Sequence, residues 1–104
     1  MNPSSRYTGK PLLRILECYV LWAIGELPES EEARLRGMEP NLRQALKQQG
    51  GWREVIEKTM KLPASMPELI RANWQKNQTI AQQQRVELSA QQFAEMFVDS
   101  NLAS

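Results

Sequence analysis

The sequence predicts an all-α fold, a compact bundle of five or six short helices packed around a central hydrophobic helix at about residues 11–27. Two observations predict it. The stretch Leu12–Leu27 is apolar round most of a helical wheel, so it needs cover on most of its sides. Elsewhere apolar residues recur at helical spacing, and no stretch shows the alternation of a β-strand.

Length and composition indicate one globular domain. The 104 residues are 41% hydrophobic and 24% charged, which is ordinary for a chain that builds its own core. Residues 1–10 are rich in turn-forming residues, and we expect them to form a flexible arm. Residues 11–104 are expected to form a single helical domain.

Charge balance and the scarcity of reactive side chains argue against several classes of function. The chain has 13 basic and 12 acidic residues, a net charge of +1, whereas nucleic acid or an anionic membrane attracts concentrated positive charge. With one cysteine and no histidine, it has no internal disulfide and poor ligands for zinc. We therefore expect a cytoplasmic, non-catalytic protein without metal or cofactor.

The polar residues of Leu12–Leu27 fall on one narrow strip of the helical wheel. Arg14 and Glu17 are expected either to pair where this helix meets water or to contact a partner. Cys18 lies on the same strip without a histidine to activate it, so we interpret it as a small packing residue. The stretch is too short and too charged to span a bilayer, which takes about 20 mainly apolar residues.

Proline and glycine residues define the expected helix ends in the first half. Gly25 marks the end of the central helix, and Ser30 is the predicted N-cap of the next one. An interior proline removes a backbone hydrogen bond at a cost of about 3 kcal/mol. We therefore predict two helices here, at residues 31–38 and 40–49, that meet at a bend near Pro40.

Three further helices are expected in the second half. A stripe with i, i+3, i+4 spacing begins at Trp52. Capping boxes at Ser65 and Ser89 start helices at about residues 67–84 and 90–100. The inward face of the last helix is expected to hold Phe93, Ala94, Met96 and Phe97. Asn101 is its predicted left-handed cap.

The helix at 67–84 carries amides where apolar residues are expected. Asn73, Asn77 and Gln84 fall inside its apolar arc, and a buried amide without a partner costs about 1–3 kcal/mol. One explanation is that they bond to backbone groups of neighbouring helix ends and loops. The other is that they line a groove beside Trp74. Our candidate partner- or ligand-binding residues are therefore Asn73, Trp74, Asn77 and Gln84, together with Trp52.

The absence of a catalytic motif favours a small protein–protein interaction module, of the kind formed by bacterial-type adaptors, inhibitors or immunity-type proteins. Tryptophans at helix edges support this hypothesis, because large rigid rings often anchor interfaces; they are Trp22, Trp52 and Trp74. We expect the partner to be another protein. A weak symmetric homodimer would cover any apolar surface that the central helix leaves exposed.

The alternative is a nucleic-acid-associated regulator. It would use a basic ridge between Arg34 and Lys47, or the C-terminal helix pair. Acidic residues among the ridge cancel much of its field, namely Glu31, Glu32 and Glu39. The C-terminal pair lacks a following recognition helix.

Overall fold

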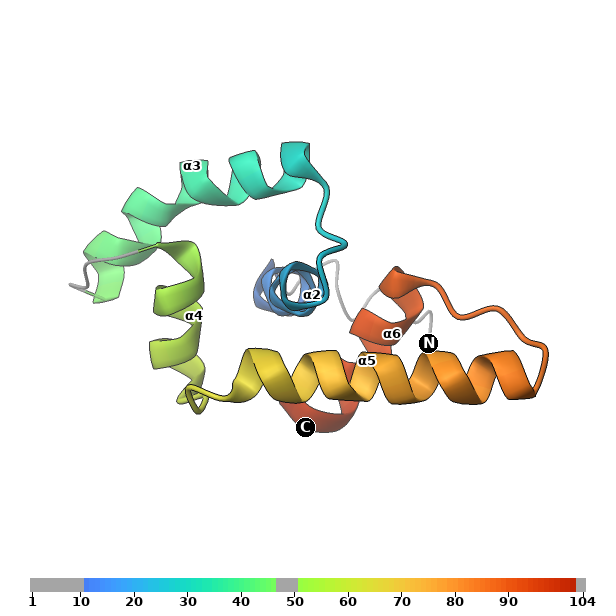
Figure 1. The fold of residues 1–104 in the computed structure, drawn as a ribbon. Helices are drawn as coiled ribbons and strands as arrows, with labels where there is room; N and C mark the ends of the chain where they lie inside the picture. Colours follow the sequence, from blue (N-terminus) through green and yellow to red (C-terminus); the bar gives the residue numbers. More distant parts are fainter. Residues whose placement is uncertain (1–10, 47–50, 103–104) are drawn as a thin grey trace, which may run out of the picture.

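The hydrophobic helix of the first half lies at the centre of the molecule. The structure is a computed structural model and describes residues 11–46 and 51–102. Figure 1 looks along α2 (Pro11–Ala23) and shows α3, α4, α5 and α6 arranged around it. From Leu13 to Ala23 its side chains are buried except for Arg14 and Trp22, which are half-buried.

The fold class is confirmed: the described residues form five α-helices and a short π-helical turn, with no strand. The expected arm at residues 1–10 lies outside these residues. None of the described helices combines the length and apolarity needed to cross a membrane.

α2 ends before the expected residue 27, at a left-handed glycine. Gly25 has a φ of 76°. Its N–H donates to the Trp22 carbonyl at 3.0 Å, and the Glu26 N–H donates to the Leu21 carbonyl at 2.8 Å. These two bonds form a Schellman motif, which satisfies carbonyls that the helix end would otherwise leave unpaired.

The same motif ends two other helices without a glycine. Lys61 follows α4 (Trp52–Met60) with a φ of 55°, and Arg85 follows α5 (Met66–Gln83) with a φ of 57°. Both sites show the paired bonds to carbonyls three and five residues back. A side chain in this conformation costs about 1–2 kcal/mol relative to right-handed backbone.

α3 (Glu29–Leu46) is one continuous helix, which corrects two predictions. It begins at Glu29, so Ser30 lies inside the first turn and is not the N-cap. The Pro28 carbonyl accepts hydrogen bonds from the N–H groups of Glu31 and Glu32. The helix also continues through Pro40. An interior proline costs one hydrogen bond and a steric contact with the preceding turn, and neither forces the chain to leave the helical path.

α4 joins α2 through an apolar face and two polar contacts. The buried face consists of Trp52, Val55 and Ile56. At its edge, Tyr19 Oη donates a 2.6 Å hydrogen bond to Glu57, and burial together with this bond raises the pKa of Tyr19. The Arg53 guanidinium lies 4.3 Å from the ring centroid of Trp22, a cation–π contact.

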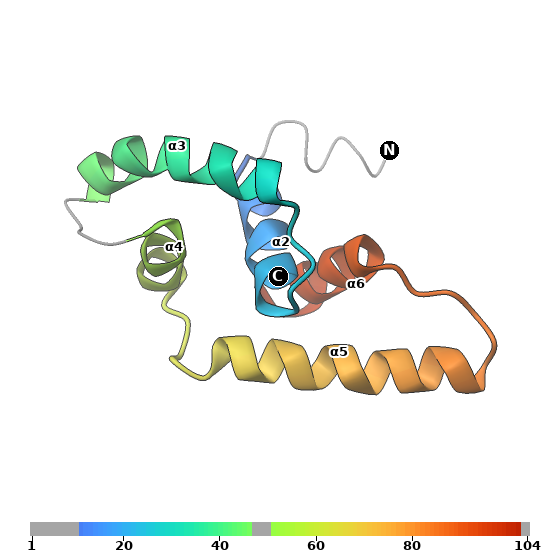
Figure 2. The same cartoon turned by 45° about the horizontal axis from the view of Figure 1, so that its top comes forward.

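α5 contacts the core with its first half and projects beyond it with its second half. Met66 and Ile70 are buried, whereas after Trp74 only Ala81 is. In Figure 2 the far end of α5 extends past α6, and the chain then returns to α6. Ser65 precedes the helix but makes no side-chain cap bond, so the capping box predicted there is absent.

α6 (Ala90–Phe97) begins with the capping box predicted at Ser89. The Ser89 Oγ accepts a hydrogen bond from the Gln92 N–H at 3.0 Å, and the Ser89 N–H donates to Gln92 Oε1 at 2.9 Å. The ring of Phe93 then packs between those of Trp74 and Phe97, at centroid distances of 5.1 and 5.9 Å. This row of rings ties α6 to α5.

The last described element is the π-helical turn η1 (Val98–Leu102). Val98 and Leu102 are buried there. Asn101 is not the left-handed cap that we predicted. It lies within the turn, and its Nδ2 donates to the Phe97 carbonyl at 3.2 Å.

The left-handed positions allow a matched pair of stability measurements. A Cβ at Gly25 would meet nothing within 4 Å, so Gly25→Ala tests backbone conformation alone and should destabilise the fold by about 1 kcal/mol. Arg85→Gly relieves the same strain and should stabilise it by up to about 1 kcal/mol. Urea denaturation measures both. Destabilisation by Arg85→Gly would contradict this account.

Candidate functional site

Two places in the structure bring polar residues together, and the first is a cluster inside the bundle. It is built by the polar strip of α2, the first turn of α3 and the start of α6. Glu17 is its most buried charged member, with only 2% of its surface exposed. Its Oε1 accepts hydrogen bonds from Arg14 at 3.1 Å and from Gln91 at 2.8 Å. Arg14 and Glu17 therefore pair with each other, as one of the two hypotheses expects, but Glu17 is buried and does not lie where α2 meets water.

The carboxylate of Glu31 completes the cluster from α3. Its Oε1 accepts from the Arg14 guanidinium and, at 3.2 Å, from the Cys18 thiol. Burial alone would raise the pKa of Glu31, but the thiol hydrogen bond and the Arg14 charge outweigh it and lower the pKa. Burial and the bond to Glu31 raise the pKa of Cys18 to about 12.

These contacts describe an internal cross-link between three helices. Arg14 is held by two carboxylates and also lies 3.3 Å from the Gln91 amide oxygen. Gln91 in turn donates to Glu95 at 2.9 Å. Burial and the hydrogen bond to Glu31 keep the Cys18 thiol protonated, which makes it a poor nucleophile. A hollow of about 310 Å³ lies alongside, between α2 and α3, but its two arginines, Arg14 and Arg34, already pair with Glu31.

Replacing Glu31 tests the electrostatics of this cluster. Because the folded-state pKa of Glu31 lies below its unfolded value, its stabilising effect is complete above the ordinary glutamate pKa, about 4.3, and is lost as the pH falls through the folded value. Glu31→Gln should therefore cost about 1–2 kcal/mol at neutral pH, and this difference should shrink in acid.

Urea denaturation of the unchanged protein and of the Glu31→Gln variant, from neutral to acidic pH, measures that difference in stability. Glu32→Gln is the control, since it removes only the surface pair with Arg36, and such pairs contribute about 0–1 kcal/mol. A cost of Glu31→Gln that stays constant with pH would show that its charge has no role.

The Cys18 thiol provides a second test. With a pKa of about 12 and a buried sulfur, it should react with a disulfide reagent at about pH 8 far more slowly than an ordinary thiol, which has a pKa of about 8.5. Absorbance of the released thiolate gives the rate. The same chain in concentrated urea serves as the control and should react fast. Equal rates in both states would place Cys18 at the surface.

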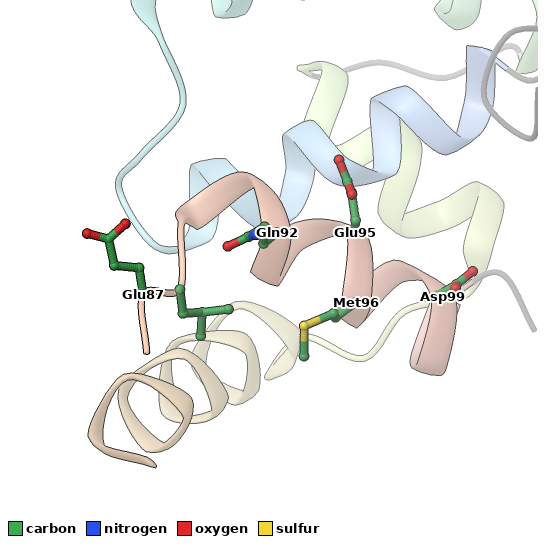
Figure 3. A pocket seen from close by; sticks show the side chains of 6 residues that line it. Glu87, Gln92, Glu95, Met96 and Asp99 are labelled. Atoms are coloured by element: carbon green, nitrogen blue, oxygen red, sulfur yellow. The ribbon is translucent and has the colours of Figure 1, made fainter. Parts of the chain in front are cut away.

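The second place is a groove of about 390 Å³ along the outer side of α6. Figure 3 shows Gln92, Glu95 and Met96 projecting from this helix, with Glu87 at one end and Asp99 at the other. The sixth lining residue is Leu88. Positions 92, 95, 96 and 99 follow the i, i+3, i+4, i+7 rule, so they share one helical face.

Met96 joins this groove to a smaller hollow between α6 and α5. The hollow has a volume of about 170 Å³, and Asn73 and Asn77 line its α5 side. Across it lie Phe93, Met96, Phe97, Ser100 and Asn101. The structure thus brings two of the predicted site residues to a surface hollow.

Asn73 and Asn77 each donate one hydrogen bond within their own helix. The Nδ2 of Asn73 donates to the Leu69 carbonyl at 3.0 Å, and that of Asn77 donates to the Asn73 carbonyl at 2.7 Å. Both side chains are half-buried. Their amide oxygens accept no hydrogen bond from the described residues, so each offers an acceptor at the hollow.

The other predicted site residues lie elsewhere. Trp52 is 3% exposed and belongs to the core. Trp74 is half-buried and packs against Phe93. Gln84 is exposed at the C-cap of α5 and lines neither hollow. None of the three faces the groove along α6.

Sequence reasoning missed the side chain that joins the two hollows. Met96 was predicted to face inward, but 50% of it is exposed. The buried positions of α6 and η1 are Phe93, Ala94, Phe97, Val98 and Leu102, and Met96 lies outside the arc that they form. The signal was available, because Met96 shares its helical face with Gln92, Glu95 and Asp99.

Exposed apolar side chains extend this surface along α5. Leu69 is 49% exposed and precedes Asn73 by one helical turn, and Ile80, 40% exposed, follows Asn77 by three residues. Together with the residues that line the groove, we call this surface the α5–α6 face: Leu69, Asn73, Asn77, Ile80, Glu87, Leu88, Gln92, Glu95, Met96 and Asp99.

Comparison with known proteins finds no relative of this chain. No protein-family model, curated protein or solved structure matches the chain.

Proposed function

We propose that this chain is a non-catalytic protein-interaction module and that the α5–α6 face is its docking surface. The observation that carries the proposal is the half-exposed Met96, which lies between two open hollows. Methionine is flexible and polarizable, and it is common at surfaces that adapt to a partner. Leu69 and Ile80 supply further apolar area on α5.

The amides of this face support the same function. Asn73 and Asn77 are uncharged, so the free-energy cost of desolvating them under a partner is lower than for a lysine or a glutamate. Their amide oxygens are acceptors that a partner's N–H groups satisfy on docking. Apolar area for affinity and a few polar groups for orientation are the usual composition of an interface.

The nucleic-acid alternative has less support. Of its basic ridge, the structure describes the side chains of Arg34 and Arg36, and each pairs with a glutamate on α3. The side chain of Arg43, and Lys47 as a whole, lie outside the described residues. The outer side of α6 carries Glu95, which would repel a phosphate backbone.

Site-specific photo-crosslinking in the organism that encodes the chain tests the docking surface. A photoreactive phenylalanine at Met96 should yield a discrete adduct with another protein, because the residue lies at the centre of the face. The matched control places the same group at Gln82, an exposed position on the other side of α5 from Asn73. Leu69→Glu/Ile80→Glu should abolish the adduct, since it buries two charges at an apolar contact.

The adduct must be specific to the face. Equal adducts from Met96 and Gln82, or an adduct that survives Leu69→Glu/Ile80→Glu, would contradict a docking surface between α5 and α6. Circular dichroism checks that each variant keeps the helical fold.

A further inference from the structure

The groove along α6 has a charge as well as a shape. Three of its lining residues are acidic, Glu87, Glu95 and Asp99, and none of the six is basic. The acidic residues are spread out: Figure 3 shows Glu87 and Asp99 at the two ends and Glu95 between them. The chain as a whole carries a net charge of +1, so this negative field is local.

Apolar and acidic groups alternate along the groove in a way that fits an amphipathic partner. Leu88 and Met96 supply the apolar contacts. Leu88 is half-buried and Met96 is 50% exposed, so part of each side chain is available. Glu87 is exposed and Glu95 is half-buried, and a cation held beside a partly desolvated carboxylate interacts more strongly than one in open water.

The groove is short. It runs from Leu88, just before α6, to Asp99 in η1. An α-helix of the same number of residues makes about three turns. An occupant that follows it therefore has about three helical turns and presents its apolar residues at i, i+3, i+4 and i+7.

We propose that the groove along α6 binds a short cationic amphipathic helix of another protein. The apolar face of that helix covers Leu88 and Met96, and its lysine or arginine side chains lie beside Glu87 and Glu95. This inference rests on the proposed function, and it names the chemistry of the partner that the α5–α6 face takes.

A synthetic peptide tests this without knowledge of the natural partner. The probe is a labelled helix-forming peptide of about four turns, with leucine on one face and lysine on the rest. Fluorescence anisotropy with the full chain should show saturable binding. A second peptide with every lysine replaced by glutamate should not bind, because the groove repels it.

Paired variants locate the binding. Glu87→Gln/Glu95→Gln keeps the size of both side chains and should weaken binding of the lysine peptide by about fivefold or more. Glu54→Gln/Glu68→Gln removes the same charge from exposed positions on α4 and α5 and should change it by less than about twofold. Met96→Ser should also weaken binding, which a purely ionic contact would not show.

Each other outcome has a defined meaning. If both peptides bind equally and Met96→Ser weakens both, the cationic partner is wrong and the docking surface stands. If the two double variants weaken binding of the lysine peptide equally, the attraction comes from the overall charge of the protein and not from the groove, and the inference fails. If neither peptide binds, the inference fails, and photo-crosslinking at Met96 decides the proposed function separately.

A second copy of the chain is the remaining occupant to exclude. Light scattering of the free chain should give a mass of 12.0 kDa. A mass that doubles with concentration and returns to 12.0 kDa in Met96→Glu would show that the groove pairs with itself, and it would overturn a partner of different sequence.

Discussion

The burial of α2 on most of its sides is the constraint on which this structure depends. A helix with apolar residues round most of its surface is stable in water only if several others cover it. Its polar strip must then be satisfied internally. Arg14 and Gln91 donate to one oxygen of Glu17, and Glu31 accepts a further hydrogen bond from Arg14. The other oxygen, Oε2, is buried without a partner among the described residues. α2 thus gains its central position at the cost of one incompletely paired carboxylate.

The same constraint determines which surfaces remain for function. Covering α2 uses the inner face of every surrounding helix, including Phe93, Phe97 and the first half of α5. Among the described residues, the large apolar side chains that stay exposed lie on the outer side of α6, on α5 and on the segment that follows α5. Rigid packing on one side of α6 and open hollows on the other make this helix the boundary between core and proposed interface.

The sequence was sufficient for the fold class and the central helix, because hydrophobic periodicity reports burial directly. The capping box at Ser89 was readable for the same local reason. The candidate site was only partly predictable. Asn73 and Asn77 were identified, but Met96 was assigned inward because the eight residues of α6 span too few turns for periodicity to separate the two edges of its apolar arc. Trp52 was read as an edge residue, since its sequence does not reveal how deeply α4 packs on α2.

The projection of α5 beyond the bundle has a consequence for how the molecule moves. Helical stability in proteins comes mostly from packing of a buried face, and after Trp74 that face contains only Ala81. The far half of α5 therefore has little support from the core, to which the helix is fixed at Ile70. Its amide hydrogens exchange with solvent by local opening, whereas those of α2 exchange only through global unfolding. A bound partner would slow exchange first at the C-terminal end of α5.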